Sequence, residues 1–265
     1  MNKVDTNFDP VSIFTKECKE EINKQSQDHL FLELSQNWMN QSWKHKYTYH
    51  FNWLGRPIIQ MPQDILALQE IIWDIKPDLI IETGIAHGGS LCLTASLLAL
   101  LELEEMKNNS IDQNEVRKRK VIGIDIDIRK HNRELIEKHF LSDKIEMIES
   151  SSVKQDTFNK VKFLSKDYRN ILVMLDSNHT ESHVLKELNL YSSLISKNSY
   201  CIVFDTIVEK MDSEFSKNRP WNKKNSPQSA IQKFLKKNDE FIIDKTIDKK
   251  IILSMAPGGF LKKIK

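Results

Sequence analysis

The sequence predicts a doubly wound α/β protein: a mostly parallel sheet of seven strands with an antiparallel C-terminal hairpin, plus an N-terminal helical extension. Two observations predict this class. Short, continuously apolar segments alternate with helical patterns, which is typical of parallel strands covered by helices on both faces. Near the C-terminus, two further apolar segments lie too close together for a parallel crossover, so we expect them to pair antiparallel.

The first 76 residues are predicted to form a helical extension and a lid. In the stretch 31–43, apolar and aromatic residues such as Phe31, Leu34, Trp38 and Met39 recur at helical spacing. The next helix should begin near Pro62, because proline suits the first turn, and should end before Pro77. Its expected apolar face comprises Leu66, Leu68, Ile71, Ile72 and Ile75.

From residue 77 onward the pattern predicts one domain of alternating strands and helices, over residues 77–265. We expect a charged surface loop at 107–119 and a helix that begins at Ser226 and Pro227. The expected helices are 90–106, 129–139, 153–164 and 182–194. The expected strands are 78–83, 120–125, 144–149, 170–176 and 200–205, followed by 240–244 and 249–255 as the antiparallel pair.

Composition excludes several classes of partner. The formal net charge is +2, with 39 basic and 37 acidic side chains, and this balance gives no electrostatic case for nucleic acid. Three cysteines without a CxxC motif favour a reducing compartment. The first ten residues lack the apolar segment of a signal peptide, and the apolar stretch 91–101 is too short to span a bilayer. We expect a cytoplasmic protein with no membrane span, and a homo-oligomer stays open.

The loop after the first parallel strand, Glu82 to Ser90, has the character of a ligand site. Gly84, Gly88 and Gly89 allow close approach of the backbone to a ligand. Their spacing matches neither a dinucleotide nor a triphosphate fingerprint, and the preceding acid would repel a phosphate. A cationic, phosphate-free ligand such as S-adenosylmethionine suits the loop better; the alternative is a tight turn without a ligand.

Two further strand ends supply candidate cofactor contacts. Asp125 ends the second strand, where a carboxylate can accept both hydroxyls of a ribose, and Asp127 is the alternative. Ser151 lies in the serine-rich turn after the third strand and could meet an adenine edge. Serine is also common in turns and helix caps, so a purely structural role stays open for it.

The densest group of chemistry-bearing residues follows the fourth and fifth strands. Asp176 and Asp205 end neighbouring strands, and two converging carboxylates suit a hard divalent ion such as Mg²⁺. His179 follows three residues after Asp176 and is the candidate general base, because histidine exchanges protons near neutral pH. A structural cap is the alternative for His179. The spacing to His183 is not HExxH, which excludes a zinc-protease motif.

Two polar segments could form the mouth of an acceptor site. Trp53 and Gln60 lie between the helical extension and the helix at Pro62, where they could form a lid. Arg219 and Trp221 precede the helix at Pro227. The alternatives are that Trp53 packs in the core and that the second segment is an ordinary surface loop.

Together these stretches resemble the cephalosporin hydroxylase / rhamnosyl O-methyltransferase family of Rossmann-like S-adenosylmethionine-dependent methyltransferases. The resemblance runs from about Trp53 to Lys265 and implies a class I methyltransferase-like fold, with a Rossmann-like methyltransferase domain at 77–265. The stretches that carry it are "WLGRPIIQMPQD", "PDLIIETGIAHGGS", "VIGIDIDIR", "LDSNHTESHVLKELNLYSSLI", "YCIVFDT", "RPWNKKNSPQSAIQKFL" and "KKIILSMAPGGFLKKIK".

The resemblance implies roles for single residues. Asp125 would bind the ribose, Asp176 and Asp205 would hold the metal, and His179 would be the base. Some family members carry two acids at the end of the fifth strand, whereas this chain has Phe204 before Asp205. The methionine part of the cofactor would lie on the loop that contains Glu82, Gly84, His87, Gly88 and Ser90.

The function predicted from these residues is methyl transfer from S-adenosylmethionine to a hydroxyl of a sugar or another small biosynthetic intermediate, assisted by Mg²⁺ if the site holds a metal. We expect a place in polysaccharide or related biosynthesis. No flavin motif, cysteine cluster or 2-His-1-carboxylate spacing supports a hydroxylase. The alternative is a non-catalytic S-adenosylmethionine-binding partner protein, and an NAD-dependent enzyme is disfavoured by the loop spacing.

Overall fold

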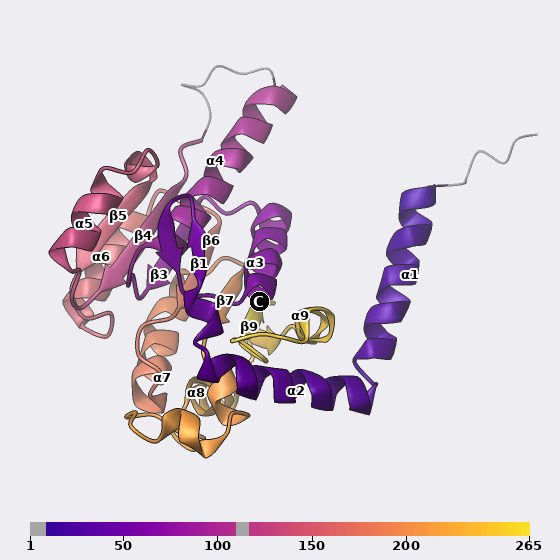
Figure 1. Ribbon diagram of the computed structural model, residues 1–265. Helices are drawn as coiled ribbons and strands as arrows, with labels where there is room; N and C mark the ends of the chain where they lie inside the picture. The colour runs from indigo at the N-terminus through magenta and orange to yellow at the C-terminus, as the bar shows by residue number, and fades with distance from the viewer. Residues whose placement is uncertain (1–8, 110–116) are drawn as a thin grey trace, which may run out of the picture.

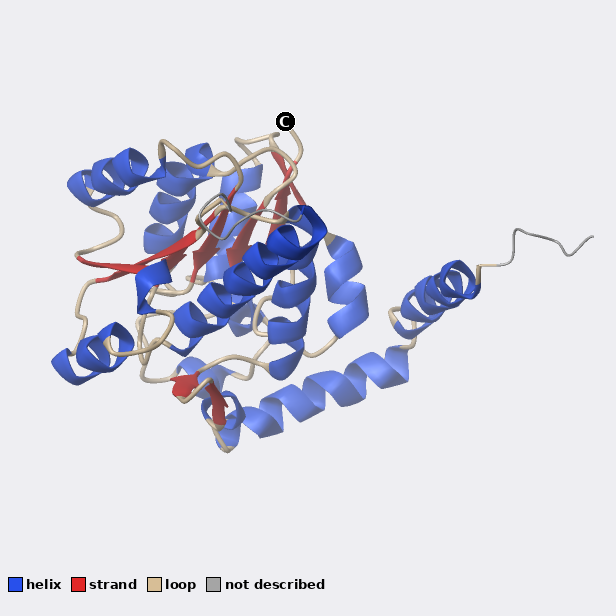
Figure 2. Cartoon of the chain, turned by 90° about the horizontal axis from the view of Figure 1, so that it is seen from above, coloured by secondary structure: helices blue, strands red, loops and turns tan. Residues whose placement is uncertain are grey.

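The protein, seen in a computed structural model that describes residues 9–109 and 117–265, is a seven-stranded sheet with helices on both faces (Figures 1 and 2). The strand order is β5-β4-β3-β6-β7-β9-β8. The first five strands are parallel, and β9 pairs antiparallel with both of its neighbours, β7 and β8. The predicted fold class is therefore confirmed. The strands are β3 (Leu79–Thr83), β4 (Lys120–Asp125), β5 (Ile145–Glu149), β6 (Ile171–Leu175), β7 (Tyr200–Val203), β8 (Phe241–Ile243) and β9 (Phe260–Lys263).

The parallel strands are buried on both faces because their side chains alternate between two hydrophobic layers. Ile80 belongs to the layer that contains α3 and α4, whereas Leu79 and Ile81 belong to the layer that contains α6, α7 and α8. The helices of the domain are α3 (Pro62–Ile75), α4 (Gly89–Asn109), α5 (Lys130–Glu137), α6 (Gln155–Ser165), α7 (Glu181–Tyr191), α8 (Pro227–Leu235) and α9 (Lys245–Ile251). Short 3-10 turns at Thr206–Glu209 and Ser213–Ser216 follow β7.

The N-terminal segment forms an arm and a small hairpin. The helices α1 (Pro10–Gln25) and α2 (His29–Lys44) project from the body of the molecule (Figure 1). A 3-10 turn, Tyr47–Tyr49, then leads into the hairpin of β1 (Phe51–Trp53) and β2 (Arg56–Ile58). That hairpin packs against α4, while α3 packs on the main sheet through Leu68, Ile71 and Ile72. The predicted division at residue 76 stays a prediction.

Helix boundaries follow local capping chemistry. Pro62 and Pro227 occupy the first turns of α3 and α8, as predicted. The Ser226 hydroxyl accepts the Ser229 N–H in a capping box at the start of α8. Leu66 is an exception to the predicted apolar face of α3, since it is 63% exposed. The predicted loop at 107–119 falls partly within α4 and partly, at 110–116, outside the described residues.

The C-terminal pair is antiparallel as expected, but its second strand was wrongly placed at 249–255. Most of that stretch belongs to the end of α9 and the turn after it. The Asp244 side chain accepts the Thr246 N–H at 3.0 Å and so caps the helix at its start. The pairing strand is β9, which Gly259 admits because a Cβ there would lie 2.1 Å from the Val203 carbonyl oxygen.

Candidate functional site

The site lies at the carboxyl ends of the parallel strands, where the winding of the sheet reverses. β3 lies between β4 and β6, and the chain proceeds outward in both directions from it. In doubly wound sheets this reversal leaves a crevice for a ligand. Gly84 makes the crevice compact, because a Cβ at this position would lie 2.1 Å from the Asp176 carbonyl oxygen and its φ is +93°.

A first cavity, of about 130 Å³, lies between the glycine-rich loop and the segment after β2. Four of the predicted cofactor residues line it: Gly84, His87, Ser90 and Asp125. The segment 57–60 forms its opposite wall, together with Asp176 and Ser177. We refer to this space as the cofactor cavity.

Asp125 shapes the loop as well as lining the cavity. Its Oδ2 accepts the N–H of Ile85 at 2.8 Å and that of Ala86 at 3.4 Å. Ala86 has a φ of +46°, an uncommon conformation for a residue with a Cβ. Asp127, the alternative ribose ligand, is exposed, and its backbone N–H donates to Asp125 Oδ1 at 3.2 Å. Its contact with Asp125 is therefore made by the backbone and not by the side chain.

Arg56 fastens the β1–β2 hairpin to the same loop, and the sequence analysis missed it. Its Nε donates to the His87 carbonyl at 2.9 Å and its Nη2 donates to Asn132 Oδ1 at 3.0 Å. Asn132 in turn donates to the Ala86 carbonyl at 2.9 Å. Arg56 is 7% exposed, and an arginine is rarely so buried unless it is paired. The available signal in the sequence was an arginine among the apolar residues of "WLGRPII".

Glu82 and Gly88 lie behind the cofactor cavity. Gly88 faces Ile136, and Glu82, which is 1% exposed, accepts the Ser90 hydroxyl. Burial raises the pKa of Glu82 to about 8, and the Ser90 hydrogen bond opposes this shift only in part. Within the described residues its Oε2 has no hydrogen-bond partner. A buried, underpaired carboxyl behind Ser90 fits a cationic ligand better than a phosphate.

We predict that Glu82 makes the protein less stable as the pH rises. Its pKa is near 4.5 in an unfolded chain and about 8 in the folded protein, so the folded state binds more protons between these values. The free energy of unfolding should therefore fall from about pH 4.5 to about pH 8, and Glu82→Gln should flatten that slope. Urea denaturation of both proteins at several pH values measures the difference; parallel slopes would contradict it.

Among the described residues, neither Ser151 nor Trp53 lines the cofactor cavity, and their predicted roles stay predictions. Ser151 follows β5 and lies outside the lining of the cofactor cavity. The Trp53 indole N–H donates to Ser96 Oγ at 3.0 Å, and its ring packs on the core beneath the hairpin. The indole of Trp53 is therefore committed to packing between the hairpin and α4.

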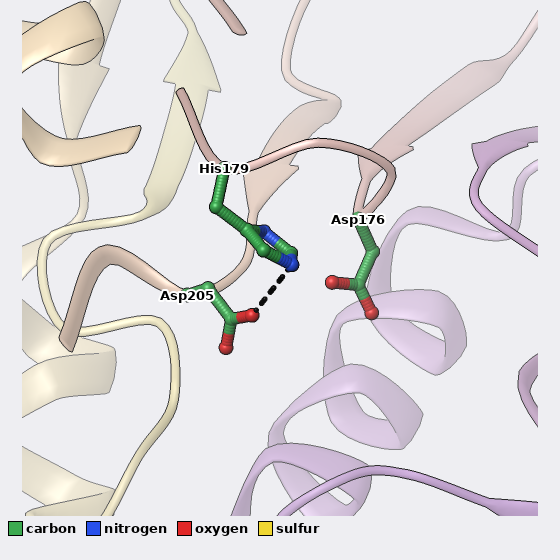
Figure 3. A group of neighbouring side chains, drawn as sticks. All are labelled: Asp176, His179 and Asp205. Atoms are coloured by element: carbon green, nitrogen blue, oxygen red, sulfur yellow. Dashed lines mark ion pairs between the residues drawn. The ribbon is translucent and has the colours of Figure 1, made fainter. Parts of the chain in front are cut away.

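Asp176, His179 and Asp205 converge at the ends of β6 and β7 (Figure 3). One ligand atom from each lies within 4.8 Å of the others, and His179 Nε2 is 3.0 Å from Asp205 Oδ2. Asp205 has a φ of +56°, a left-handed conformation that aspartate tolerates and that places its carboxylate toward the histidine. This grouping agrees with the expectation that acids at the ends of neighbouring strands converge.

Gln60 connects this cluster to the hairpin segment. Its Nε2 donates to Asp176 Oδ2 at 3.0 Å. Burial, together with the nearby Asp205 carboxylate, raises the pKa of Asp176 well above its usual range. Phe204, which precedes Asp205, is buried, so an apolar ring lies beside this cluster.

A second cavity, of about 240 Å³, opens on the other side of Asp176. We refer to this space as the acceptor cavity. His179, Phe204 and Asp205 line it. Trp43, Thr48 and Tyr49, from the end of α2 and the turn after it, form the outer wall. The sequence analysis missed these three because they lie more than 120 residues away from Asp176 in the chain.

Trp221 and Arg219 lie next to the acceptor cavity and not in it. Trp221 is 7% exposed, and its ring meets that of His179 edge-on at 5.9 Å. Arg219 is exposed, lies over Trp221 at 5.7 Å and lines a neighbouring groove. Trp221 therefore supports the imidazole from behind, while Arg219 faces solvent.

No helix among the described residues is long and apolar enough to cross a bilayer. The described cysteines, Cys18, Cys92 and Cys201, are all free thiols.

Curated proteins are similar to this chain in sequence. A Rhamnosyl O-methyltransferase of Mycobacterium leprae (strain TN) is 25% identical over 155 residues, which cover 58% of this chain and 59% of that protein. The Rhamnosyl O-methyltransferase of Mycobacterium tuberculosis (strain ATCC 25618 / H37Rv) is 27% identical over 144 residues, 54% of this chain and 51% of that protein. The chain thus spans between half and three fifths of the length of these curated relatives.

Solved structures support the fold. A cmcI structure with Mg and SAM superposes with a TM-score of 0.54 at 16% identity, covering 82% of this chain and 78% of that one. A cmcI structure with SAH gives a TM-score of 0.52 at 15% identity, covering 85% and 91%. The family model described as Rhamnosyl O-methyltransferase/CmcI matches residues 45–264, and this chain belongs to that family.

Proposed function

We propose that the protein is an S-adenosylmethionine-dependent O-methyltransferase that acts on a hydroxyl of a sugar or another small biosynthetic intermediate. One observation carries this proposal. The cofactor cavity and the acceptor cavity share a common wall formed by Ile59, Gln60, Ala86, Asp176 and Ser177. A methyl donor and an acceptor hydroxyl placed on the two sides would therefore meet beside Asp176, within reach of His179.

The residues of the chain supply positioning and proton removal. Asp125 would accept the ribose hydroxyls while it holds the amides of Ile85 and Ala86. His179, held at 3.0 Å from Asp205, would accept the proton of the acceptor hydroxyl. S-adenosylmethionine, when bound, supplies the methyl group that passes from sulfur to this oxygen and leaves a neutral thioether. Positioning two reactants in adjoining cavities provides much of such an acceleration.

The cluster of Asp176 and Asp205 also fits a divalent cation. Mg²⁺ is commonly held by one or two carboxylates, with water and substrate oxygens completing its shell. Two converging carboxylates therefore suffice, although Phe204 stands where some relatives have an acid. When bound, Mg²⁺ supplies Lewis-acid stabilisation of charge on the acceptor oxygen.

Asp125 is expected to matter most for cofactor affinity. Asp125→Ala should weaken binding of S-adenosylhomocysteine by about 1.5–3 kcal/mol, the range for hydrogen bonds to a charged group. Titration calorimetry of both proteins measures the change. Asp127→Ala is the matched control, because the side chain of Asp127 is exposed and its backbone N–H makes the contact. Equal affinities in wild type and Asp125→Ala would remove Asp125 from the ribose role.

The experiment that tests the function is transfer of a labelled methyl group from S-adenosylmethionine to a panel of rhamnosides and related sugars. The curated relatives are rhamnosyl O-methyltransferases, which makes rhamnose the first acceptor to include. Methylated product supports the proposal. Tight binding of S-adenosylmethionine with no transfer to any acceptor would instead favour a non-catalytic cofactor-binding partner, the alternative that Phe204 motivates. The free cysteines favour a reducing compartment such as the cytoplasm. A place in polysaccharide or related biosynthesis is proposed from the rhamnosyl relatives.

A further inference from the structure

A basic groove adjoins the acceptor cavity. The groove has a volume of about 420 Å³, and Trp43 lines both spaces, so they meet at this indole. Its other lining residues are Lys44, Lys46, Glu214, Phe215, Asn218 and Arg219. Three cations against one carboxylate make it a positively charged extension of the site where the acceptor would lie.

The cations of this groove lack a carboxylate partner among the described residues. Glu214 pairs with Lys217 at 3.4 Å, and Lys44 donates to the uncharged Gln41 at 3.0 Å. Within the part of the chain that the structure describes, Lys44, Lys46 and Arg219 form no ion pair with a carboxylate. Most of the positive charge of the groove is therefore available to an anion.

The backbone at Lys46 is held in an uncommon conformation. Its φ is +51°, in the left-handed region that a lysine rarely adopts, and its N–H donates to the Trp43 carbonyl at 2.8 Å. Such a conformation costs free energy and persists where surrounding contacts impose it. It turns the chain sharply between α2 and the wall of the acceptor cavity and leaves Lys46 in the lining of the groove.

A row of aromatic rings joins the groove to the proposed base. Starting at His179, the ring of Trp221 lies at 5.9 Å, Phe215 lies 5.2 Å from Trp221, and Trp43 lies 4.0 Å from Phe215. Trp221 is 7% and Phe215 is 9% exposed, so these two rings mainly pack against one another, and Trp43, which lines both spaces, is the ring that a ligand would meet. An acceptor that extended past the indole of Trp43 would reach the basic groove while its hydroxyl stayed near His179.

We propose that the acceptor is anionic: a sugar whose phosphate or diphosphate group lies in the groove of Lys44, Lys46 and Arg219. This inference rests on the proposed function, because it assumes that the acceptor hydroxyl lies at His179. A nucleoside diphosphate sugar is the chemical class that fits best. Its sugar would occupy the acceptor cavity, its diphosphate would meet the cations, and its base has a π-face for the indole of Trp43.

The test is titration calorimetry of the S-adenosylhomocysteine-loaded protein with dTDP-rhamnose, methyl rhamnoside and inorganic pyrophosphate. We expect dTDP-rhamnose to bind more tightly than the neutral rhamnoside, and its affinity to fall as salt is added. Lys46→Ala and Arg219→Ala should each weaken it by about threefold to tenfold, and the double variant by more. Lys130→Ala is the matched control, since this lysine lies on α5 with its side chain 91% exposed and should change nothing.

The outcomes separate this inference from the proposed function. Binding of S-adenosylhomocysteine should be equal in wild type and in the groove variants, because Lys46 and Arg219 lie outside the cofactor cavity. Failure of both pyrophosphate and dTDP-rhamnose to bind at low salt, with the cofactor product still bound, would overturn the anionic acceptor alone. Unchanged affinity for dTDP-rhamnose in the double variant would also overturn it. Failure of the cofactor product itself to bind would overturn the proposed function.

Discussion

His179→Ala should lower kcat by about 10²–10⁴, the usual range for loss of a general base. His179 lies in the loop between β6 and α7, its Nε2 is 3.0 Å from Asp205, and it lines the acceptor cavity. Affinity for S-adenosylhomocysteine should stay nearly unchanged, because His179 does not line the cofactor cavity. Steady-state kinetics with a methylated acceptor, together with calorimetry, measures both quantities.

The pH profile distinguishes a base from a structural histidine. Activity of His179→Ala should recover partly at high pH, where the acceptor hydroxyl loses its proton more readily without a base. A purely structural role would instead lower activity at every pH and would also lower the melting temperature. A variant with normal kcat would leave His179 as a cap or packing residue.

The control for this experiment is best taken from an exposed histidine such as His131. His183 is unsuitable because its Nε2 lies 3.1 Å from Ser152 Oγ and 3.4 Å from the fully buried Glu187. Ser177, which lines both cavities, also donates to Glu187 at 2.7 Å. Loss of His183 would therefore disturb a buried polar network beneath the site. We expect His131→Ala to keep wild-type kcat.

The sequence predicted the parts of the molecule that local pattern determines. The five parallel strands are continuous apolar segments, and Asp125, Asp176 and Asp205 are found at or just after strand ends because acids follow those segments. The prediction of a strand at 249–255 was wrong because it too relied on local composition. The isoleucines and leucine of this segment favour a strand by composition, yet the Asp244 cap and the close approach that Gly259 permits decide the actual structure.

The residues of the N-terminal segment that line the acceptor cavity could not be predicted from local sequence pattern. Trp43 and Tyr49 reach the cavity only because the N-terminal arm returns across the ends of β6 and β7, a contact that no local pattern records. Trp53 shows the converse: an aromatic residue near a predicted lid, with an indole N–H committed to Ser96. Tertiary packing therefore decides which tryptophan lines the acceptor cavity.

The second large effect that we expect is loss of activity when divalent metal is removed. Asp176 and Asp205 are half-buried carboxylates whose ligand atoms, with that of His179, lie within 4.8 Å of one another. Stabilisation of a reacting oxygen by a cation is typically worth several kcal/mol, which corresponds to about a thousandfold or more in rate. Treatment with EDTA should therefore lower kcat by roughly that factor, and Mg²⁺ should restore it.

Asp205→Asn tests the same site without a chelator. The amide keeps the shape of the side chain but removes its charge, so Mg²⁺ should bind more weakly, by calorimetry, in the absence of any acceptor. Asp212→Asn, in the exposed loop after β7, is the matched control and should bind Mg²⁺ as the wild type does. Full activity in EDTA, combined with full activity of Asp205→Asn, would show that the reaction proceeds without metal. Phe204 would then be the residue to examine, because its buried ring precedes Asp205 and leaves Asp176 and Asp205 as the two carboxylates of the cluster.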